Sequence, residues 1–284
     1  MSANIVFHLA ATVAYAVLGL WFWLQTAKGQ SQAKLDVPSR AAFAGVIAIH
    51  IAAVTSSIFP NGHLYLGWAI ALSAAICLGM ILFWFQSMHI RSEGLLLILL
   101  PAGSFVSLLA SVFPYGHIVN HANNELLRIH LIIAFLAYGI TAIAAMHAIL
   151  MAMLDKHLHR PIAEAHKRTL LDQALDSMPA LLVQERLLFQ LIKIGFAVLT
   201  LTVFTGAMVS MRISHTLAPI DHKTVFTLLS WCTFGVLLWG RNKQGWRGRI
   251  ALRWTLAGFA FVLLAYTGSR FVLDVLISNS SELM

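Results

Sequence analysis

Two long apolar runs joined by a short basic turn dominate the C-terminal third of the sequence. They cover about residues 223–240 and 251–276, and each is close to the ~20 residues that a helix needs to cross a bilayer. Four cations lie in the turn, namely Arg241, Lys243, Arg247 and Arg249. Because short loops rich in Lys and Arg stay in the cytoplasm, the pattern predicts a transmembrane hairpin with a cytoplasmic turn. His222, just ahead of the first run, is then expected at the outer face.

The composition extends this prediction to the whole chain. Of the 284 residues, 59% are hydrophobic and only 11% are charged, and the mean hydropathy is +0.80, so no ordinary soluble domain fits between the apolar runs. Eight runs of near-spanning length are present, at about 3–24, 39–58, 64–86, 94–113, 129–154, 187–210, 223–240 and 251–276. We predict an all-α polytopic membrane protein, a single transmembrane domain over residues 1–284 with about eight helices. Gly195, Gly206 and Gly258 are expected to permit close helix packing and to take no part in chemistry.

The charges in the loops predict which side of the membrane each loop faces. Loops one, three, five and seven hold most of the Lys and Arg, whereas loops two, four and six hold only Arg128, Arg212 and Lys223. By the positive-inside rule, both termini are expected on the outer, periplasmic side. The net charge of +8 therefore indicates topology and no nucleic-acid partner. Cys77 and Cys232 lie inside apolar runs and form no CxxC pair, which excludes thiol–disulfide exchange, a zinc knuckle and covalent haem attachment.

The fifth loop, about residues 155–186, is the one long segment predicted on the cytoplasmic side. Charged and apolar residues mix after Pro161, which suits the first turn of a helix. A surface helix lying along the membrane is one interpretation. A docking site for a cytoplasmic partner is the other.

Histidines gather at the predicted outer face. Seven of the thirteen lie at or near it, namely His8, His63, His117, His121, His130, His215 and His222. Neutral imidazole is the usual protein ligand of haem iron, and two helices offering one histidine each can hold a haem between them. His130 and His222 begin the fifth and seventh predicted spans, so they fall at the same predicted depth. We predict haem b bound there, with His130 and His222 on the iron; each is also open to interpretation as a hydrated helix-end residue.

Further polar residues are candidates for the same cofactor site. Arg128 and Arg270 are cations at the predicted outer face and can reach a haem propionate. His50 lies within the second span, and a polar group at membrane depth usually faces the bundle interior, a partner or a cofactor. A satisfied interior hydrogen bond is the alternative role for His50.

Three segments resemble a known family. They read MPALLVQERLLFQLIKIGFAVLTLTVFTGAM at 178–208, GWRGR at 245–249 and AYTGSRFV at 265–272, and they are similar to the CcsA/ResC cytochrome c assembly family. Weaker similarity occurs at 58–68 (IFPNGHLYLGW) and 126–150 (LLRIHLIIAFLAYGITAIAAMHAIL). The resemblance covers about residues 58–273, and it is to the smaller YpjD/HemX-like branch of eight-span inner-membrane proteins in particular.

The resemblance implies that His130 matches an external axial histidine of CcsA-type proteins. Those proteins carry a tryptophan-rich loop between the sixth and seventh spans, whereas here the loop is MRISHTLAPIDHK, with no tryptophan and with His222 where the family has proline. The second external histidine of the family, after the last span, has no counterpart here. Because this haem-presenting surface is incomplete, we expect no catalytic residues and no enzyme activity.

Together these patterns predict a multi-pass inner-membrane protein that binds or handles haem as an accessory to cytochrome c assembly or haem homeostasis. The expected partners are the lipid bilayer, haem, and other membrane or cytochrome-maturation proteins. An alternative from another class is a haem-free regulatory or scaffold protein. It would act through residues 155–186 on a haem-synthesis enzyme or a membrane partner.

Overall fold

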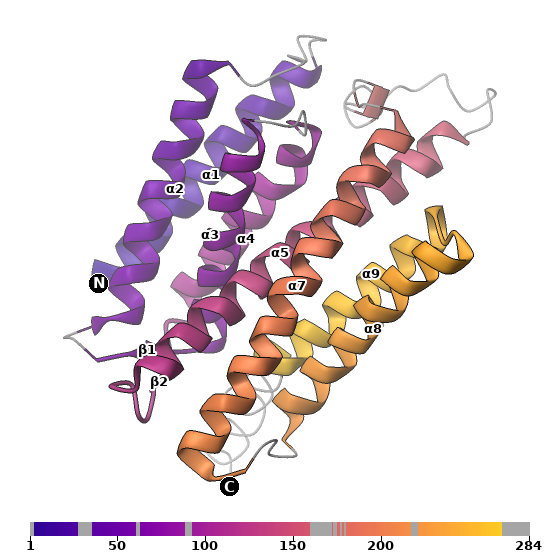
Figure 1. Ribbon diagram of the computed structural model, residues 1–284. Coiled ribbons are helices and arrows are strands. Elements are labelled where there is room, and N and C mark those ends of the chain that lie inside the picture. Colours follow the sequence, from indigo (N-terminus) through magenta and orange to yellow (C-terminus); the bar gives the residue numbers. More distant parts are fainter. Residues whose placement is uncertain are drawn as a thin grey trace, which may run out of the picture.

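The protein is a bundle of antiparallel helices (Figure 1). The computed structural model describes residues 3–27, 36–60, 63–88, 93–159, 172, 175–176, 178, 180–216 and 221–268. Within them lie eight apolar helices: α1 (Ala3–Ala27), α2 (Val37–Ile58), α3 (Trp68–Gln86), α4 (Leu96–Val112), α5 (Glu125–Leu158), α7 (Leu181–Ser214), α8 (His222–Gln244) and α9 (Gly248–Leu263). Seven are long and apolar enough to cross a membrane, and α4, with 17 residues, lies at the lower limit of spanning length. The predicted all-α class with multiple membrane-crossing helices is confirmed.

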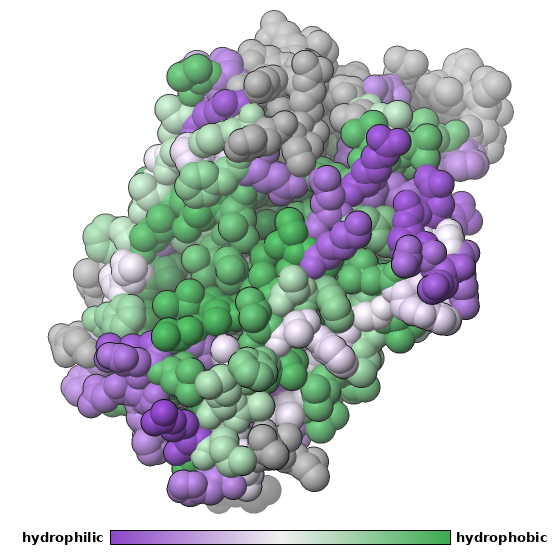
Figure 2. Space-filling view, viewed as in Figure 1, coloured by the Kyte–Doolittle hydropathy of each residue, from purple (hydrophilic) through white to green (hydrophobic). Residues whose placement is uncertain are grey.

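The surface matches the composition of the helices. Figure 2 shows a broad apolar band across the middle of the molecule, with hydrophilic residues gathered toward its two ends. Large apolar side chains are exposed on the long helices, among them Val13, Val17, Leu20 and Phe204. In water such an apolar surface would drive association, whereas in a bilayer it contacts the apolar acyl chains of the lipids.

The helices form three neighbouring groups (Figure 1). Helices α1 to α4 pack together, with α1 lying between α2 and α4. Helices α5 and α7 run side by side through the centre, and α3 packs on α5. The α8–α9 hairpin packs on the opposite side of this central pair, where α9 contacts α5 and α8 contacts α7. The central pair therefore joins the N-terminal group to the C-terminal hairpin.

The tightest contact between groups is the crossing of α3 and α5. Gly139 lies against the backbone of Ala75 and Gly79, so a Cβ added at Gly139 would overlap the Ala75 carbonyl oxygen. Without apolar exclusion from water, membrane helices gain stability from such close backbone approach. Gly139 thus fixes the depth at which α5 meets α3.

A short ribbon closes one end of the bundle. Strand β1 (Tyr65–Leu66) pairs antiparallel with β2 (His117–Ile118), and Tyr65 Oη accepts a hydrogen bond from Gly116 N at 3.0 Å. The third span was predicted to begin at residue 64, but α3 begins at Trp68 because residues 65–66 pair as a strand. We call this the ribbon end, and the end with the 245–247 turn the basic end.

Helices α5 and α7 are longer than the apolar runs that predicted them. Each has 34 residues, against predicted spans of 129–154 and 187–210. Helix α5 begins where Asn124 Oδ1 accepts hydrogen bonds from Leu126 N and Leu127 N, and α7 ends at His215, whose φ is +54°. Capping groups set these ends, and hydropathy does not detect capping.

Candidate functional site

His130 lies in the second turn of α5 at the ribbon end, facing α7. Its Nδ1 is 2.9 Å from Thr205 Oγ1. The neighbouring residue, Gly206, has no side chain, and a Cβ there would stand 3.1 Å from His130 Cε1. The second ring nitrogen, Nε2, has no hydrogen-bond partner in the described chain and is not among the atoms sealed from the surface. Within the described residues the imidazole is therefore held through Nδ1 and makes no hydrogen bond at Nε2.

Sequence reasoning assigned no role to Thr205, and it gave Gly206 a packing role alone. Both residues end the GFAVLTLTVFTG segment, and they meet His130 because α5 and α7 run antiparallel. Gly195, about three turns away on α7, does pack against α5, at Ile140 and Thr141. The signal that could have identified Gly206 is a Thr-Gly pair at the same predicted depth as His130.

His222 is the first residue of α8, at the same end of the bundle. Asp221 precedes it as the N-cap and accepts a hydrogen bond from Thr224 N at 2.8 Å. The His222 side chain is exposed, and in the described part of the chain no hydrogen bond or ring contact joins it to His130. The structure thus places both predicted ligands at one end without bringing the two rings into contact.

Of the cations predicted at the outer face, Arg128 and Lys223 lie at the ribbon end. Arg128 is exposed and lies two residues before His130 on α5. Its Nε donates to Ala122 O, just ahead of the helix, at 2.6 Å. Arg270 lies outside the described residues. Lys223 sits 5.6 Å from the centroid of the Tyr266 ring, which ties the start of α8 to the turn after α9 (Leu264–Gly268).

His50 lies inside the N-terminal group and is fully buried. Its Nδ1 is 3.1 Å from Tyr15 Oη and its Nε2 is 2.8 Å from Ser73 Oγ, so both ring nitrogens have partners. His8 stacks edge-on to it with 6.4 Å between ring centroids, and His8 Nε2 is 3.1 Å from Ser57 Oγ. Helices α1, α2 and α3 each supply part of this interior polar network. The arrangement leaves His50 no open lone pair for a cofactor.

At the ribbon end, one imidazole, that of His130, has the features of a ligand for haem iron. A haem ligand needs an imidazole nitrogen that is unprotonated and accessible, with the ring oriented from its other side. His130 has an open Nε2 and a fixed Nδ1. His222 is exposed at the same end and can supply a second bond only if the ring reaches the iron from the start of α8.

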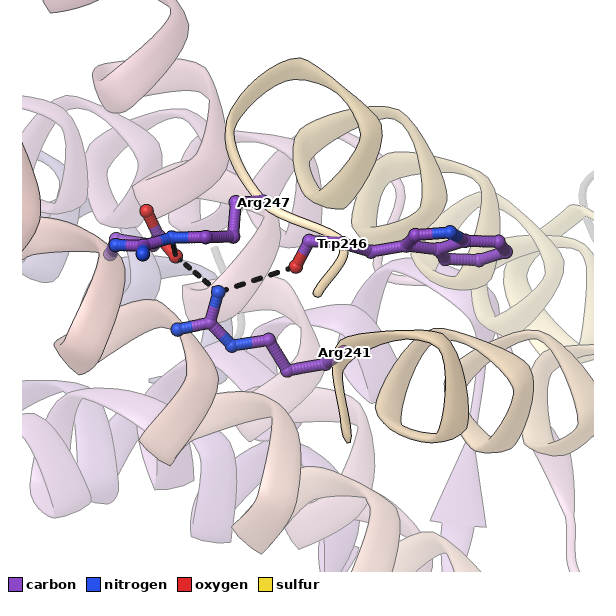
Figure 3. A network of polar contacts seen from close by, with 4 residues as sticks. Arg241, Trp246 and Arg247 are labelled. Atoms are coloured by element: carbon purple, nitrogen blue, oxygen red, sulfur yellow. Dashed lines mark hydrogen bonds and ion pairs between the residues drawn. The ribbon is translucent and has the colours of Figure 1, made fainter. Parts of the chain in front are cut away.

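A second polar cluster lies at the basic end (Figure 3). The Glu185 carboxylate, near the start of α7, accepts hydrogen bonds from Arg241 Nη1 at 2.6 Å and from Arg247 Nε at 2.9 Å. Arg241 also donates to the Trp246 carbonyl oxygen at 3.3 Å. Sequence reasoning assigned these arginines to topology alone. The available signal was Glu185 itself, an acidic residue next to an apolar run.

The basic turn also contacts the end of α5. Arg249 Nε donates to Asp155 Oδ2 at 3.0 Å. Nearby, the ring of His147 on α5 is buried, with Nε2 3.0 Å from the Gln184 carbonyl oxygen at the start of α7. The end of α5 and the start of α7 are therefore both attached to the α8–α9 turn. These are the two helix ends that border the long segment predicted in the cytoplasm.

Two known proteins of similar sequence align over nearly the full length of this chain, and a third aligns over about a third of it. The Escherichia coli (strain K12) inner membrane protein YpjD is 31% identical over 272 residues, covering 94% of this chain and 97% of the relative. An uncharacterized 28.8 kDa protein of Azospirillum brasilense is 28% identical over 98% of this chain and 100% of its own length. The cytochrome c biogenesis protein CcsA of Prochlorococcus marinus is 32% identical over 88 residues, 31% of this chain and 28% of the relative.

No solved structure matches the chain. The family comparison covers nearly all of it, since residues 7–277 match the cytochrome c assembly proteins. This match includes both clusters described above and every described helix except the first few residues of α1. The chain is a member of the cytochrome c assembly protein family.

Proposed function

We propose that this protein binds haem b at the ribbon end of the bundle and handles it as an accessory to cytochrome c assembly or haem homeostasis, without catalysis of its own. The observation that carries the proposal is His130, an imidazole held at Nδ1 by Thr205 and open at Nε2. Membership of the cytochrome c assembly family supports it, as does the partial similarity to proteins named CcsA. The E. coli relative is named an inner membrane protein, and we place this chain in the same membrane.

Each residue at the ribbon end has a proposed role. His130, through Nε2, and His222, from the start of α8, would hold the haem iron. Arg128, which now donates to Ala122 O, would pair with a propionate, as would Arg270, a cation expected at the same face from the sequence. When bound, the haem supplies an iron that accepts imidazole ligands and can change its oxidation state. The absence of a CxxCH motif means that the haem is held without covalent bonds.

An absorbance spectrum of the purified protein tests the proposal. The protein is purified in detergent, incubated with hemin, passed through a desalting column, and measured oxidised and dithionite-reduced. We expect a Soret band that shifts on reduction and a sharpened α band, with about one haem per chain by pyridine haemochrome. A protein that remains colourless after hemin treatment would overturn the proposal.

A second candidate function is favoured by the contacts at the basic end. Asp155 and Glu185 border the long segment predicted in the cytoplasm, and both are bound by arginines of one turn. A partner that binds this segment would act directly on the α8–α9 hairpin. On this hypothesis the protein is a haem-free regulator of a haem-synthesis enzyme or a membrane partner.

The two candidates predict different results in cells. A strain lacking the protein is complemented with the natural chain or with a chain whose residues 160–176 are replaced by a Gly-Ser linker of equal length. The regulatory function predicts that the linker variant fails to restore haem-precursor levels while the protein accumulates normally. The haem-binding function predicts that the linker variant restores them, and that His130→Ala does not.

A further inference from the structure

The hydroxyl of Thr205 contacts both His130 and its own helix. Its Oγ1 lies 2.9 Å from His130 Nδ1, and it lies 2.8 Å from the carbonyl oxygen of Leu201, one turn earlier on α7. A third neighbour, the Thr202 carbonyl oxygen, is 3.3 Å away. A threonine hydroxyl has one proton to donate and two lone pairs to accept with.

The direction of these bonds follows from the group to which the Thr205 hydroxyl donates. A carbonyl oxygen can only accept, and donation to the carbonyl four residues earlier, here Leu201 O at 2.8 Å, is the common bond of a helical threonine. In that arrangement Oγ1 accepts from His130 Nδ1, and Nδ1 carries the hydrogen. In a neutral imidazole one nitrogen is protonated and the other is not, so Nε2 holds the free lone pair.

Gly206 provides the space for this ring position. A Cβ at residue 206 would stand 3.1 Å from His130 Cε1 and 3.8 Å from each ring nitrogen. The first of these distances is below ordinary van der Waals contact, so an alanine here pushes the ring away from α7. Thr205 and Gly206 therefore act on the same imidazole from adjacent positions of one helix.

We propose that Thr205 and Gly206 are positioning residues that hold His130 as the Nδ1–H tautomer and so make Nε2 the nitrogen that coordinates the metal of a bound haem. This inference rests on the proposed function for the identity of the ligand. The tautomer itself does not depend on haem. Partners that fix the outer nitrogen of a ligating histidine typically change metal affinity 10–100-fold when removed.

The first test measures the tautomer in the haem-free protein. Histidine labelled with ¹⁵N is incorporated, and nitrogen chemical shifts are recorded in lipid bilayers at a pH where imidazole is neutral; His130→Gln identifies the signal. We expect Nδ1–H for the natural chain and for Thr205→Ser, and a mixture of tautomers for Thr205→Val and Gly206→Ala. Thr202→Val is the matched control, since that hydroxyl bonds only to Val198 O. A protonated Nε2 in the natural chain would overturn the proposal.

The second test measures haem affinity in the same variants. We expect Thr205→Val to weaken haem binding about tenfold and to shift the midpoint potential, with Thr205→Ser and Thr202→Val close to the natural chain. If the natural chain has the Nδ1–H tautomer but takes up no haem, the proposed function fails and the positioning of His130 stands. If haem binds and Thr205→Val changes neither the tautomer nor the affinity, the positioning role is wrong and the proposed function stands.

Discussion

Glu185 Oε1 accepts a hydrogen bond from Arg241 Nη1 at 2.6 Å, and this charged bond joins the start of α7 to the end of α8. Arg247, across the turn, donates to the same carboxylate oxygen. The Glu185 side chain is only 8% exposed, whereas Arg241 and Arg247 are 28% and 53% exposed. The carboxylate is thus the enclosed partner, and both arginines are more exposed than the group they bind.

Removing this carboxylate charge is expected to destabilise the bundle. Glu185→Gln leaves two arginines facing each other across a neutral amide. Because the pair is partly enclosed, we expect a loss of about 2 kcal/mol in the free energy of unfolding, between the ~0–1 kcal/mol of exposed pairs and the ~3–5 kcal/mol of broken buried ones. Thermal unfolding in detergent measures it. Arg249→Gln is the control, because its pair with Asp155 is more exposed, and an equal loss in both variants would contradict the argument.

Reporter fusions test the side of the membrane on which each end of the bundle lies. Fusions after Gln30, after Arg91, within residues 160–176 and after Lys243 are expected to report the cytoplasm. A fusion after Met284 is expected to report the outside. The charges of the loops are the reason, since all four internal positions lie in Lys- and Arg-rich loops. A cytoplasmic C-terminus would place His130 and His222 on the wrong side for the proposed function.

Substitution of the candidate ligands separates them by severity. His130→Ala is expected to remove most of the bound haem. His222→Ala is expected to retain haem with an altered low-spin spectrum or added high-spin character, because His215 or His121 can take its place from a neighbouring loop. His50→Ala should leave the spectrum nearly intact. If His50→Ala strips the haem and His130→Ala does not, the cofactor lies within the N-terminal group and the ribbon-end site is wrong.

We expect His50 to stabilise the fold and to take no part in cofactor binding. His50→Leu leaves Tyr15 Oη and Ser73 Oγ without their partner in a buried setting, which costs about 1–3 kcal/mol for each unsatisfied group. Thermal unfolding of the variant in detergent checks this. Thr55→Ala, on the exposed face of the same helix, should change the unfolding temperature little. Equal stability of the two variants would show that the network is not structural.

The crossing of α3 and α5 predicts a strong contrast between two glycines. Gly139→Ala places a methyl group against Ala75 O, and the helices must separate, at a cost of about 1–3 kcal/mol or more. Gly45→Ala in α2 meets nothing within 4 Å and should be neutral or slightly stabilising, because alanine favours helix. Unfolding temperatures of the two variants decide. A tolerated Gly139→Ala would mean that the crossing is looser than described.

The helices were predictable because each apolar run has the length that a bilayer requires, and the error at the third span shows the limit of this signal. Residues 64–67 (LYLG) continue the apolar run of the helix that follows, yet residues 65–66 pair with residues 117–118 as a strand. Hydropathy measures transfer into lipid and carries no information on strand pairing. Hydropathy likewise carries no information on hydrogen bonding, so it did not reveal that Asn124 caps the start of α5.

The candidate site was predictable only in part. His130 was identified from residue type, predicted depth and family resemblance. Its partner Thr205 is 75 residues away in sequence, and the contact depends on the register between α5 and α7. Likewise, Glu185 and Arg241 are 56 residues apart, and their charges alone indicate neither partner. Pairings of this kind are set by helix packing, which a single sequence does not encode in any local pattern.

The length of α5 has a consequence for where a ligand of His130 would lie. At 1.5 Å per residue, 34 residues extend about 51 Å, and at the ~20° tilt typical of membrane helices they cover about 48 Å along the bilayer normal. This is slightly more than the ~40–45 Å of a bilayer with its headgroups, so α5 is long enough to reach from one headgroup region to the other. His130 is five residues past the start of α5, about 7 Å along the helix, and with that start at the headgroup surface it lies near the depth at which hydrocarbon begins. A flat molecule with an apolar ring and two carboxylates can enter there sideways from the lipid, with its ring in the acyl chains and its acids among the headgroups.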